Sequence, residues 1–184
     1  MSSLNDKLAA VTTEFLEKAP DFALQEPAGS VVRLYEELKK GPVILVFYRG
    51  AWCPYCNLTI AAYQSALDKI HASGAQLIAI SPQKPDSSLT MKERHDLQFH
   101  VLSDTGNNVA DAYNLTFTLQ DELIEAYTKL GINLPDFNGN EHWLLPIPAT
   151  YVINQEGYIS YAYTNMDHTQ RADPTDILNH IKLQ

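Results

Sequence analysis

The chain has only two cysteines among its 184 residues, and it has no long hydrophobic run. Two cysteines are too few for the disulfide framework of a small secreted domain. A closed zinc site needs four ligands, so we expect no metal site either. The longest apolar run, residues 42–48, is far too short to span a bilayer. Residues 1–7 lack the apolar stretch of a signal peptide. These absences predict a protein of the cytoplasm, a reducing compartment, with no membrane partner.

Basic side chains are also scarce, because 13 lysines and arginines stand against 22 aspartates and glutamates and give a net charge of −9. The deficit is concentrated in residues 101–184, which carry eleven acidic residues and only three basic ones, Lys129, Arg171 and Lys182. This balance does not favour contact with a phosphate backbone, so no nucleic-acid partner is expected.

The composition is that of a globular chain, with 45% hydrophobic and 19% charged residues. A length of 184 residues suits one domain with a sizeable core, so residues 1–184 are predicted to form a single domain. Apolar residues near the N-terminus recur at helical spacing, which predicts a helical extension over residues 1–18. They are Leu4, Leu8, Val11 and Phe15.

The pattern of apolar residues predicts strands that alternate with helices. Residues 43–48 form a continuous run typical of a strand buried on both faces, a helix follows over 54–72, and a second buried strand covers 76–80. A crossover of this kind is right-handed and joins parallel strands. The order predicts an α/β fold with a central mixed sheet and helices on both faces. Further strands are expected at 22–24, 31–34, 99–102, 149–153 and 158–163. Further helices are expected at 34–40, 86–96 and 106–113, in a segment that ends at Lys129, and from 173 onward.

Two segments have weaker local signals. Thr118 and Asp121 resemble a capping box for the helix that ends at Lys129. Residues 131–148 contain three prolines and look like a loop. The insertion 115–146 is expected either to cover a functional site or to pack against an edge of the sheet.

The informative motif is Arg49-Gly50-Ala51-Trp52-Cys53-Pro54-Tyr55-Cys56, which lies where the central strand ends and a helix begins. Pro54 suits the first helical position, which makes Cys53 the N-cap. The unpaired backbone N–H groups and the helix dipole at that position favour a thiolate, so the pKa of Cys53 is expected to be low. Arg49 is a candidate for a further positive charge.

Cys56 has a different predicted place. It begins an apolar stripe of the helix that faces the core, whereas Cys53 lies at the exposed end. This suggests that Cys53 is the nucleophile and Cys56 the resolving thiol, and that the two form a disulfide through a mixed disulfide or a sulfenic acid. Trp52 and Tyr55 are candidate walls of the site. A purely structural or metal-binding role for the two cysteines is the alternative.

At these residues the chain resembles the peroxiredoxin-like (AhpC/TSA) branch of the thioredoxin-fold superfamily, over about residues 19–182. Besides the motif, the segments Ala19–Leu24, Leu102–Asp104 and Pro148–Ile153 fit that family. The resemblance implies a thioredoxin-like fold and an antioxidant oxidoreductase that reduces hydroperoxides. It also implies no bound cofactor and a reductant such as thioredoxin, glutaredoxin or a small thiol, and it is compatible with a homodimer. In thioredoxin-like proteins a cis-proline lies beside the cysteine motif, and Pro148 holds that place here.

The chain departs from the family at two positions. Typical peroxiredoxins carry Thr or Ser three residues before the reactive cysteine, where this chain has Gly50, and an arginine just before the strand that begins at Ala149, where this chain has Pro148. A disulfide reductase of proteins or small disulfides therefore stays open as an alternative to a peroxidase. A non-enzymatic redox sensor or interaction module is the third reading. Arg49, Trp52, Pro54, Tyr55 and Pro148 are the predicted pocket residues around Cys53 and Cys56.

Overall fold

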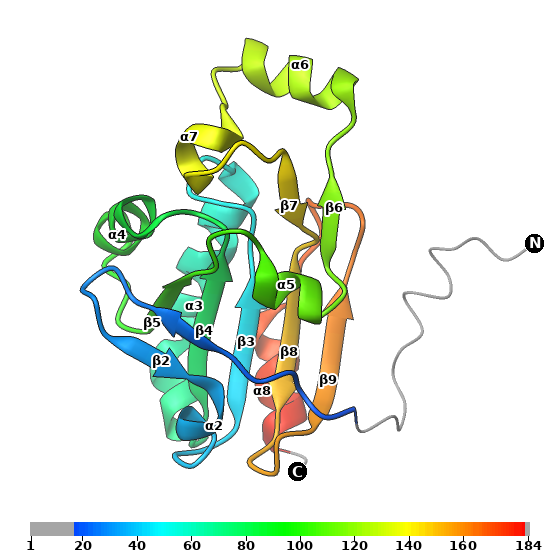
Figure 1. Ribbon diagram of the computed structural model, residues 1–184. Coiled ribbons are helices and arrows are strands. Elements are labelled where there is room, and N and C mark those ends of the chain that lie inside the picture. The colour runs from blue at the N-terminus through cyan, green and yellow to red at the C-terminus, as the bar shows by residue number, and fades with distance from the viewer. Residues whose placement is uncertain (1–16, 183–184) are drawn as a thin grey trace, which may run out of the picture.

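The computed structural model describes residues 17–182 of the chain (Figure 1). The helical extension predicted over residues 1–18 lies outside the described residues, except for Glu17 and Lys18. Lys18 forms an isolated bridge with Tyr158. No helix in the described part is long and apolar enough to cross a membrane.

A central seven-stranded sheet organises the described chain, with the strand order β2-β1-β5-β4-β3-β8-β9. Strand β3 pairs with β4 in parallel and with β8 in antiparallel register, so the sheet is mixed, as the sequence predicts. β4 and β5 are also parallel, and β8 and β9 form the predicted hairpin. The strands are β1 (Ala23–Gln25), β2 (Val31–Arg33), β3 (Val43–Phe47), β4 (Gln76–Ser81), β5 (His100–Ser103), β8 (Ala149–Ile153) and β9 (Ile159–Thr164).

Helices cover both faces of this sheet (Figure 1). The helices are α2 (Leu34–Glu37), α3 (Pro54–Ala72), α4 (Pro85–Arg94), α5 (Asn108–Ala112), α6 (Asp121–Lys129), α7 (Leu134–Asn138) and α8 (Pro174–Lys182). The bounds of α3 agree with the sequence prediction, because its apolar stripe is long and regular.

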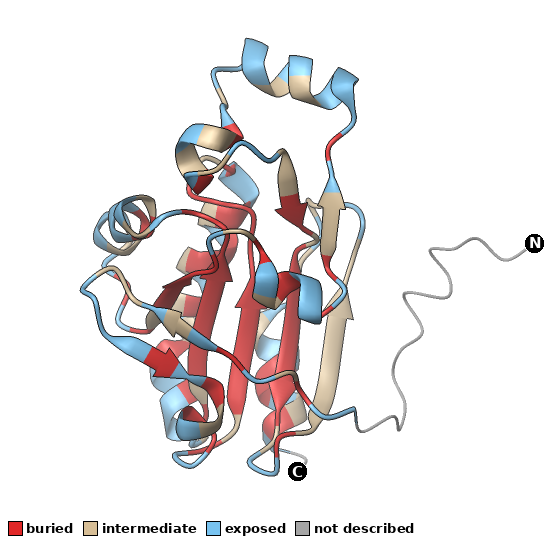
Figure 2. Cartoon of the chain, in the orientation of Figure 1, coloured by how far each residue is buried: buried red, intermediate tan, exposed pale blue. Residues whose placement is uncertain are grey.

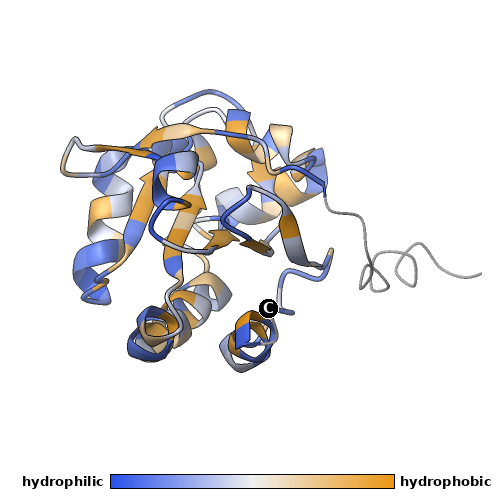
Figure 3. Ribbon diagram, turned by 90° about the horizontal axis from the view of Figure 1, so that it is seen from below, coloured by the Kyte–Doolittle hydropathy of each residue, from blue (hydrophilic) through white to orange (hydrophobic). Residues whose placement is uncertain are grey.

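Alternation along β3 explains the two layers of core. Ile44 and Val46 pack with α3, α4 and α8 on one face, whereas Leu45 and Phe47 pack with α2 and α5 on the other. All five residues of β3 are buried, and in Figure 2 the central strands are red between partly exposed helices. Figure 3 shows α8, beside the C-terminus, with hydrophobic residues on only part of its surface. The buried residues of that helix are Ile177, Leu178 and Ile181.

The prediction that residues 131–148 form a loop is wrong. This segment contains α7 and the strand β7 (Leu144–Pro146), which pairs in antiparallel register with β6 (Thr116–Thr118). These elements span only three to five residues each and depend on contacts with residues distant in the sequence. They are therefore too short for a periodic pattern that would predict them. The predicted capping box is also absent, because Thr118 belongs to β6 and the N-cap of α6 is Gln120, without a side-chain hydrogen bond.

The insertion forms a separate layer at the carboxyl end of β3, at the top of Figure 1. Its own small core consists of Leu119, Leu134 and Leu145. Trp52 of the cysteine motif and Tyr127 of α6 pack against this core. The insertion therefore packs over the cysteine motif.

Candidate active site

The cysteine motif forms the turn between β3 and α3. Pro54 is the first residue of α3 and Cys53 is its N-cap, with the extended backbone angles φ −90° and ψ 115°. The Cys53 N–H donates to the carbonyl oxygen of Gly50 over 3.1 Å, which closes the turn. The local geometry predicted from Pro54 is confirmed, since a proline without an N–H costs nothing at this position.

Both sulfurs are buried. Cys56 begins the core stripe of α3 as predicted, but the expectation that Cys53 lies at an exposed end is wrong, because its exposed fraction is 0%. The helix N-terminus is covered by side chains that the local sequence does not place there, above all the guanidinium of Arg49. Both thiols are free rather than joined by a disulfide.

Arg49 connects the thiol to the insertion. Its Nη2 donates to the Cys53 sulfur over 3.1 Å and its Nη1 donates to the Tyr127 hydroxyl over 2.9 Å. The guanidinium also lies 5.0 Å from the centre of the Trp52 ring, and Trp52 in turn packs edge-on against Tyr127 with ring centroids 5.5 Å apart. Arg49 is only 6% exposed, so its charge acts on the sulfur with little screening by water.

The surroundings drive the pKa values of the two thiols apart. The pKa of Cys53 is lowered to about 5, first by a hydrogen bond from the Cys56 side chain and then by the hydrogen bond and charge of Arg49, which together outweigh the effect of burial. The pKa of Cys56 is raised, first by its hydrogen bond to Cys53 and then by burial. The geometry therefore favours a Cys53 thiolate beside a neutral Cys56 thiol.

A second arginine approaches Cys56. The Nη2 of Arg171 lies 3.8 Å from the Cys56 sulfur, and its Nη1 donates to the carbonyl oxygen of Gln170 over 2.7 Å. In the same segment, His168 contacts the ring of Tyr55 edge-on at 5.8 Å between centroids. Burial lowers the pKa of His168, the positive charge of Arg49 lowers it further, and the nearby Cys53 acts in the opposite sense.

The other predicted pocket residues lie around this turn. Tyr55 is 44% exposed beside Cys53, and Pro148 precedes Ala149, which pairs with Phe47 at the end of β3. The peptide bond before Pro148 is trans, as are all peptide bonds between the described residues, so the cis-proline that the family resemblance suggests is absent. In this trans arrangement the Ile147 N–H donates to the carbonyl oxygen of Leu115 over 2.7 Å and ties the turn to the insertion.

Gly50 has a structural reason to be glycine. Its φ is +154°, and a Cβ at this position would meet the indole nitrogen of Trp52 and the side-chain oxygen of Gln83. That oxygen of Gln83 accepts a short hydrogen bond from the Ala51 N–H. The space that a threonine would need is thus filled by two side chains that shape the turn.

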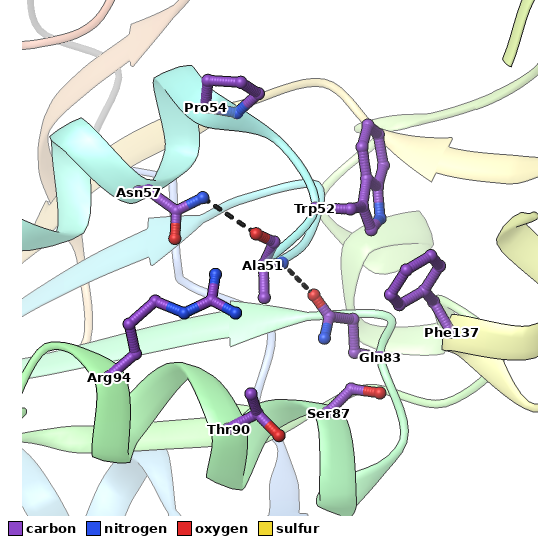
Figure 4. A pocket seen from close by; sticks show the side chains of 9 residues that line it. All are labelled: Ala51, Trp52, Pro54, Asn57, Gln83, Ser87, Thr90, Arg94 and Phe137. Carbon is purple, nitrogen blue, oxygen red and sulfur yellow. Dashed lines mark hydrogen bonds between the residues drawn. The ribbon is translucent and has the colours of Figure 1, made fainter. Parts of the chain in front are cut away.

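A pocket of about 450 Å³ opens on the other side of this turn (Figure 4). Trp52 and Pro54 are among its lining residues, but neither cysteine is. His142 does not line this pocket, and its backbone N–H donates to the side-chain oxygen of Asn140 at an exposed position. No group of three potential metal ligands occurs among residues 17–182.

Sequence reasoning missed Tyr127, Arg171, His168 and Gln83 as neighbours of the cysteines. They come from three segments far from the motif, and the fold alone brings them together. Arg171 is one of only three basic residues after position 100, and this scarcity is the one sequence signal that could have drawn attention to it.

The fold is similar to that of solved peroxiredoxin structures. A peroxidoxin, BcpB of Mycobacterium tuberculosis, superposes with a TM-score of 0.73 at 20% identity and covers 91% of this chain and 95% of that one. The bacterioferritin comigratory protein of Xanthomonas campestris, whose structure concerns alkyl peroxide reduction, has a TM-score of 0.67 at 13% identity over 88% and 90% of the chains. These likenesses confirm the thioredoxin-like fold.

Relatives in sequence agree with this picture. The chloroplastic peroxiredoxin Q of Oryza sativa subsp. japonica is 29% identical over 147 residues, which are 80% of this chain and 57% of that protein. The chain thus spans little more than half the length of the plant relatives it matches. The AhpC/TSA family profile matches residues 16–162, which include β1 to β8 and both cysteines. With a match over most of its length, the chain belongs to the AhpC/TSA family.

Proposed function

We propose that the chain is a thiol peroxidase that reduces hydroperoxides, with Cys53 as nucleophile and Cys56 as resolving thiol. The observation that carries the proposal is the buried hydrogen bond from Arg49 to the Cys53 sulfur, at 3.1 Å. A cation held on a sulfur stabilises the thiolate, which is the form that attacks an oxidant. Membership of the AhpC/TSA family supports the same activity.

The reaction has two steps at the protein. The Cys53 thiolate attacks one oxygen of the peroxide, so that an S–O bond forms, the O–O bond breaks and the leaving oxygen takes up a proton as water or alcohol. The Cys56 sulfur then attacks the Cys53 sulfenic acid, a disulfide forms and water leaves. Because no surface of Cys53 is exposed, the oxidant reaches the sulfur when a covering side chain moves.

A dithiol or two thiols must then return two electrons to the disulfide. Thioredoxin, glutaredoxin or a small thiol can supply them by thiol–disulfide exchange. The structurally similar bacterioferritin comigratory protein of Xanthomonas campestris reduces alkyl peroxides. This supports organic hydroperoxides as oxidants of the present protein, in addition to hydrogen peroxide. We place the protein in the cytoplasm, where two thiols three residues apart stay reduced between turnovers. Assembly as a homodimer belongs to the same proposal, on family resemblance alone.

A disulfide reductase is a second candidate, and one observation favours it. Position 50 is a glycine whose missing side chain leaves no hydroxyl to bind a peroxide, and Pro148 offers no positive charge before β8. The two thiols of one helical turn nevertheless suit exchange with an external disulfide. The same Cys53 thiolate would attack in both reactions, so only the oxidant distinguishes them.

Stopped-flow consumption of hydrogen peroxide and cumene hydroperoxide, together with reduction of insulin, separates these activities. We expect the wild type to consume peroxide, Cys53→Ser to lose that activity, and Cys56→Ser to complete one turnover that ends in a sulfenic acid. Mass spectrometry should find a 53–56 disulfide in the oxidised wild type.

Insulin reduction without peroxide consumption would instead establish the disulfide reductase. A protein that forms the 53–56 disulfide but turns over neither substrate would fit a redox sensor or interaction module. A peroxidase activity retained by Cys53→Ser would overturn the assigned order.

A further inference from the structure

The pocket beside the cysteine motif contains polar side chains that the redox chemistry does not use (Figure 4). It has a volume of about 450 Å³, within the usual range for small-molecule sites. Three parts of the chain meet around it: the cysteine turn with the start of α3, the residues that follow β4, and α4, with α7 at its rim. The lining residues are Ala51, Trp52, Pro54, Asn57, Gln83, Ser87, Thr90, Arg94 and Phe137.

Gln83 leaves a donor without a partner in this pocket. The residue is 0% exposed, its side-chain oxygen accepts from the Ala51 N–H, and its Nε2 has no hydrogen-bond partner among the described residues. In Figure 4 the amide nitrogen of Gln83 lies on the side of Thr90 and Arg94. An unpaired buried N–H group destabilises the folded protein, and a ligand with an acceptor oxygen would pair it.

Arg94 supplies a positive charge at the same place. Its side chain extends from α4 toward Asn57 and Ala51 in Figure 4, and no ion pair of Arg94 occurs within residues 17–182. None of the nine lining residues is acidic. An unpaired guanidinium beside a free amide donor is suited to a carboxylate.

The helix α4 turns one polar face to the pocket. Ser87, Thr90 and Arg94 lie three and four residues apart, so they share a side of the helix. The opposite wall is apolar and contains the rings of Trp52 and Phe137. A ligand that fills the pocket would therefore carry a negative head toward α4 and an apolar body against the rings.

We propose that this pocket binds a small organic carboxylate whose apolar body packs on Trp52 and Phe137 and whose carboxylate is bound by Arg94 and the Gln83 amide. The proposal goes beyond the peroxidase reaction, because neither cysteine lines the pocket. A bound ligand would nevertheless contact Trp52, whose ring packs against Arg49. Only the Trp52 side chain would then separate the ligand from the guanidinium that binds the Cys53 sulfur.

Isothermal titration of the reduced wild-type protein with 1-naphthylacetate tests the proposal, with the uncharged 1-naphthylacetamide as matched probe. We expect the carboxylate to bind and the amide to bind at least about fivefold more weakly, since hydrogen bonds to a charged group are stronger than those to a neutral one. Binding should persist in Cys53→Ser, so the result does not depend on the proposed peroxidase activity.

Two variants locate the carboxylate. Arg94→Gln should weaken binding of 1-naphthylacetate at least about fivefold, whereas Arg33→Gln, at an exposed position on the outermost strand, should leave it unchanged. Gln83→Glu keeps the oxygen that Ala51 needs but replaces the free amide donor by a negative charge, so it should abolish binding. Because Arg94 is exposed, its variant carries the test even if Gln83→Glu does not fold.

A nuclear magnetic resonance titration shows where the ligand lies. The indole N–H signal of Trp52 should shift, while that of Trp143, which does not line the pocket, should stay, with Trp143→Phe used for assignment. The proposal is overturned if acid and amide bind equally, if Arg94→Gln and Arg33→Gln behave alike, or if no binding is detected.

Discussion

The guanidinium of Arg49 lies 3.1 Å from the sulfur of Cys53, and the Tyr127 hydroxyl holds its other nitrogen at 2.9 Å. A cation four residues before the cysteine is thus oriented by a side chain 78 residues further along the chain. The sulfur, the cation and the tyrosine are one chain of contacts, and each can be removed separately.

Removing the cation should raise the pKa of Cys53. In Arg49→Met the charge and its hydrogen bond to the sulfur are lost, and we expect the pKa of Cys53 to rise from about 5 by about 1–2 units. The measurement is the pH dependence of iodoacetamide alkylation, with thiolate absorbance at 240 nm as a second readout. Arg33→Met is the matched control, and an unchanged Cys53 profile in Arg49→Met would refute the role of the guanidinium.

Removing the tyrosine hydroxyl should have a smaller effect of the same sign. Tyr127→Phe keeps the ring against Trp52 but deletes the oxygen that positions Arg49, so the pKa of Cys53 should rise by about half a unit. Tyr158→Phe, in the hairpin at the other end of the sheet, should change nothing. If Tyr127→Phe matches the wild type in its alkylation profile while Arg49→Met does not, Tyr127 has no positioning role.

The depressed pKa also makes stability depend on pH. Because the pKa of Cys53 is about 5 in the folded protein and about 8.5 in an unfolded chain, the ionised thiol stabilises the fold above the unfolded value. That contribution is lost as pH falls through the folded value. The free energy of unfolding of reduced wild type, minus that of Cys53→Ser, should therefore grow between about pH 5 and pH 8.5, by at most about 1.4 kcal/mol per unit.

Urea denaturation at several pH values measures this difference. Above about pH 8.5 the raised pKa of Cys56 begins to act in the opposite direction, so the test belongs below it. If the difference in the free energy of unfolding between wild type and Cys53→Ser stays constant over this pH range, Cys53 binds protons equally in the folded and the unfolded states.

Gly50 links the fold to the site. Gly50→Ala should destabilise the protein by about 2–4 kcal/mol, because its Cβ would displace Trp52 and Gln83 in addition to the strain at φ +154°. Gly74→Ala is the matched control, since Gly74 has φ +81° but no atom within 4 Å of the added Cβ, and it should cost only about 1 kcal/mol. Equal losses in urea denaturation would show that Trp52 and Gln83 do not restrict position 50.

The sequence predicted what local patterns determine. The long apolar stripe of α3 predicted both ends of this helix, and Pro54 predicted that Cys53 is its N-cap. The burial of Cys53 was not predictable, because Arg49 is held on it by Tyr127 from an inserted helix without a buried residue of its own. The elements α7 and β7 were not predicted for a similar reason. Such short segments are stabilised by tertiary contacts, which leave no periodic pattern in the local sequence.

Arg171 places a positive charge near the Cys56 thiol, and removal of this charge should slow only the formation of the disulfide. With its nitrogen 3.8 Å from the Cys56 sulfur, the positive charge of Arg171 counteracts the raised pKa of Cys56 and so favours its attack on a Cys53 sulfenic acid. In Arg171→Gln we expect sulfenic acid formation at the wild-type rate and disulfide formation a few times slower, since a partly exposed cation contributes roughly 0.5–1 kcal/mol. Dimedone trapping followed by mass spectrometry measures both rates, and Arg171→Lys should restore part of the second. Equal rates of disulfide formation in wild type and Arg171→Gln would mean that Cys56 attacks without help from this arginine.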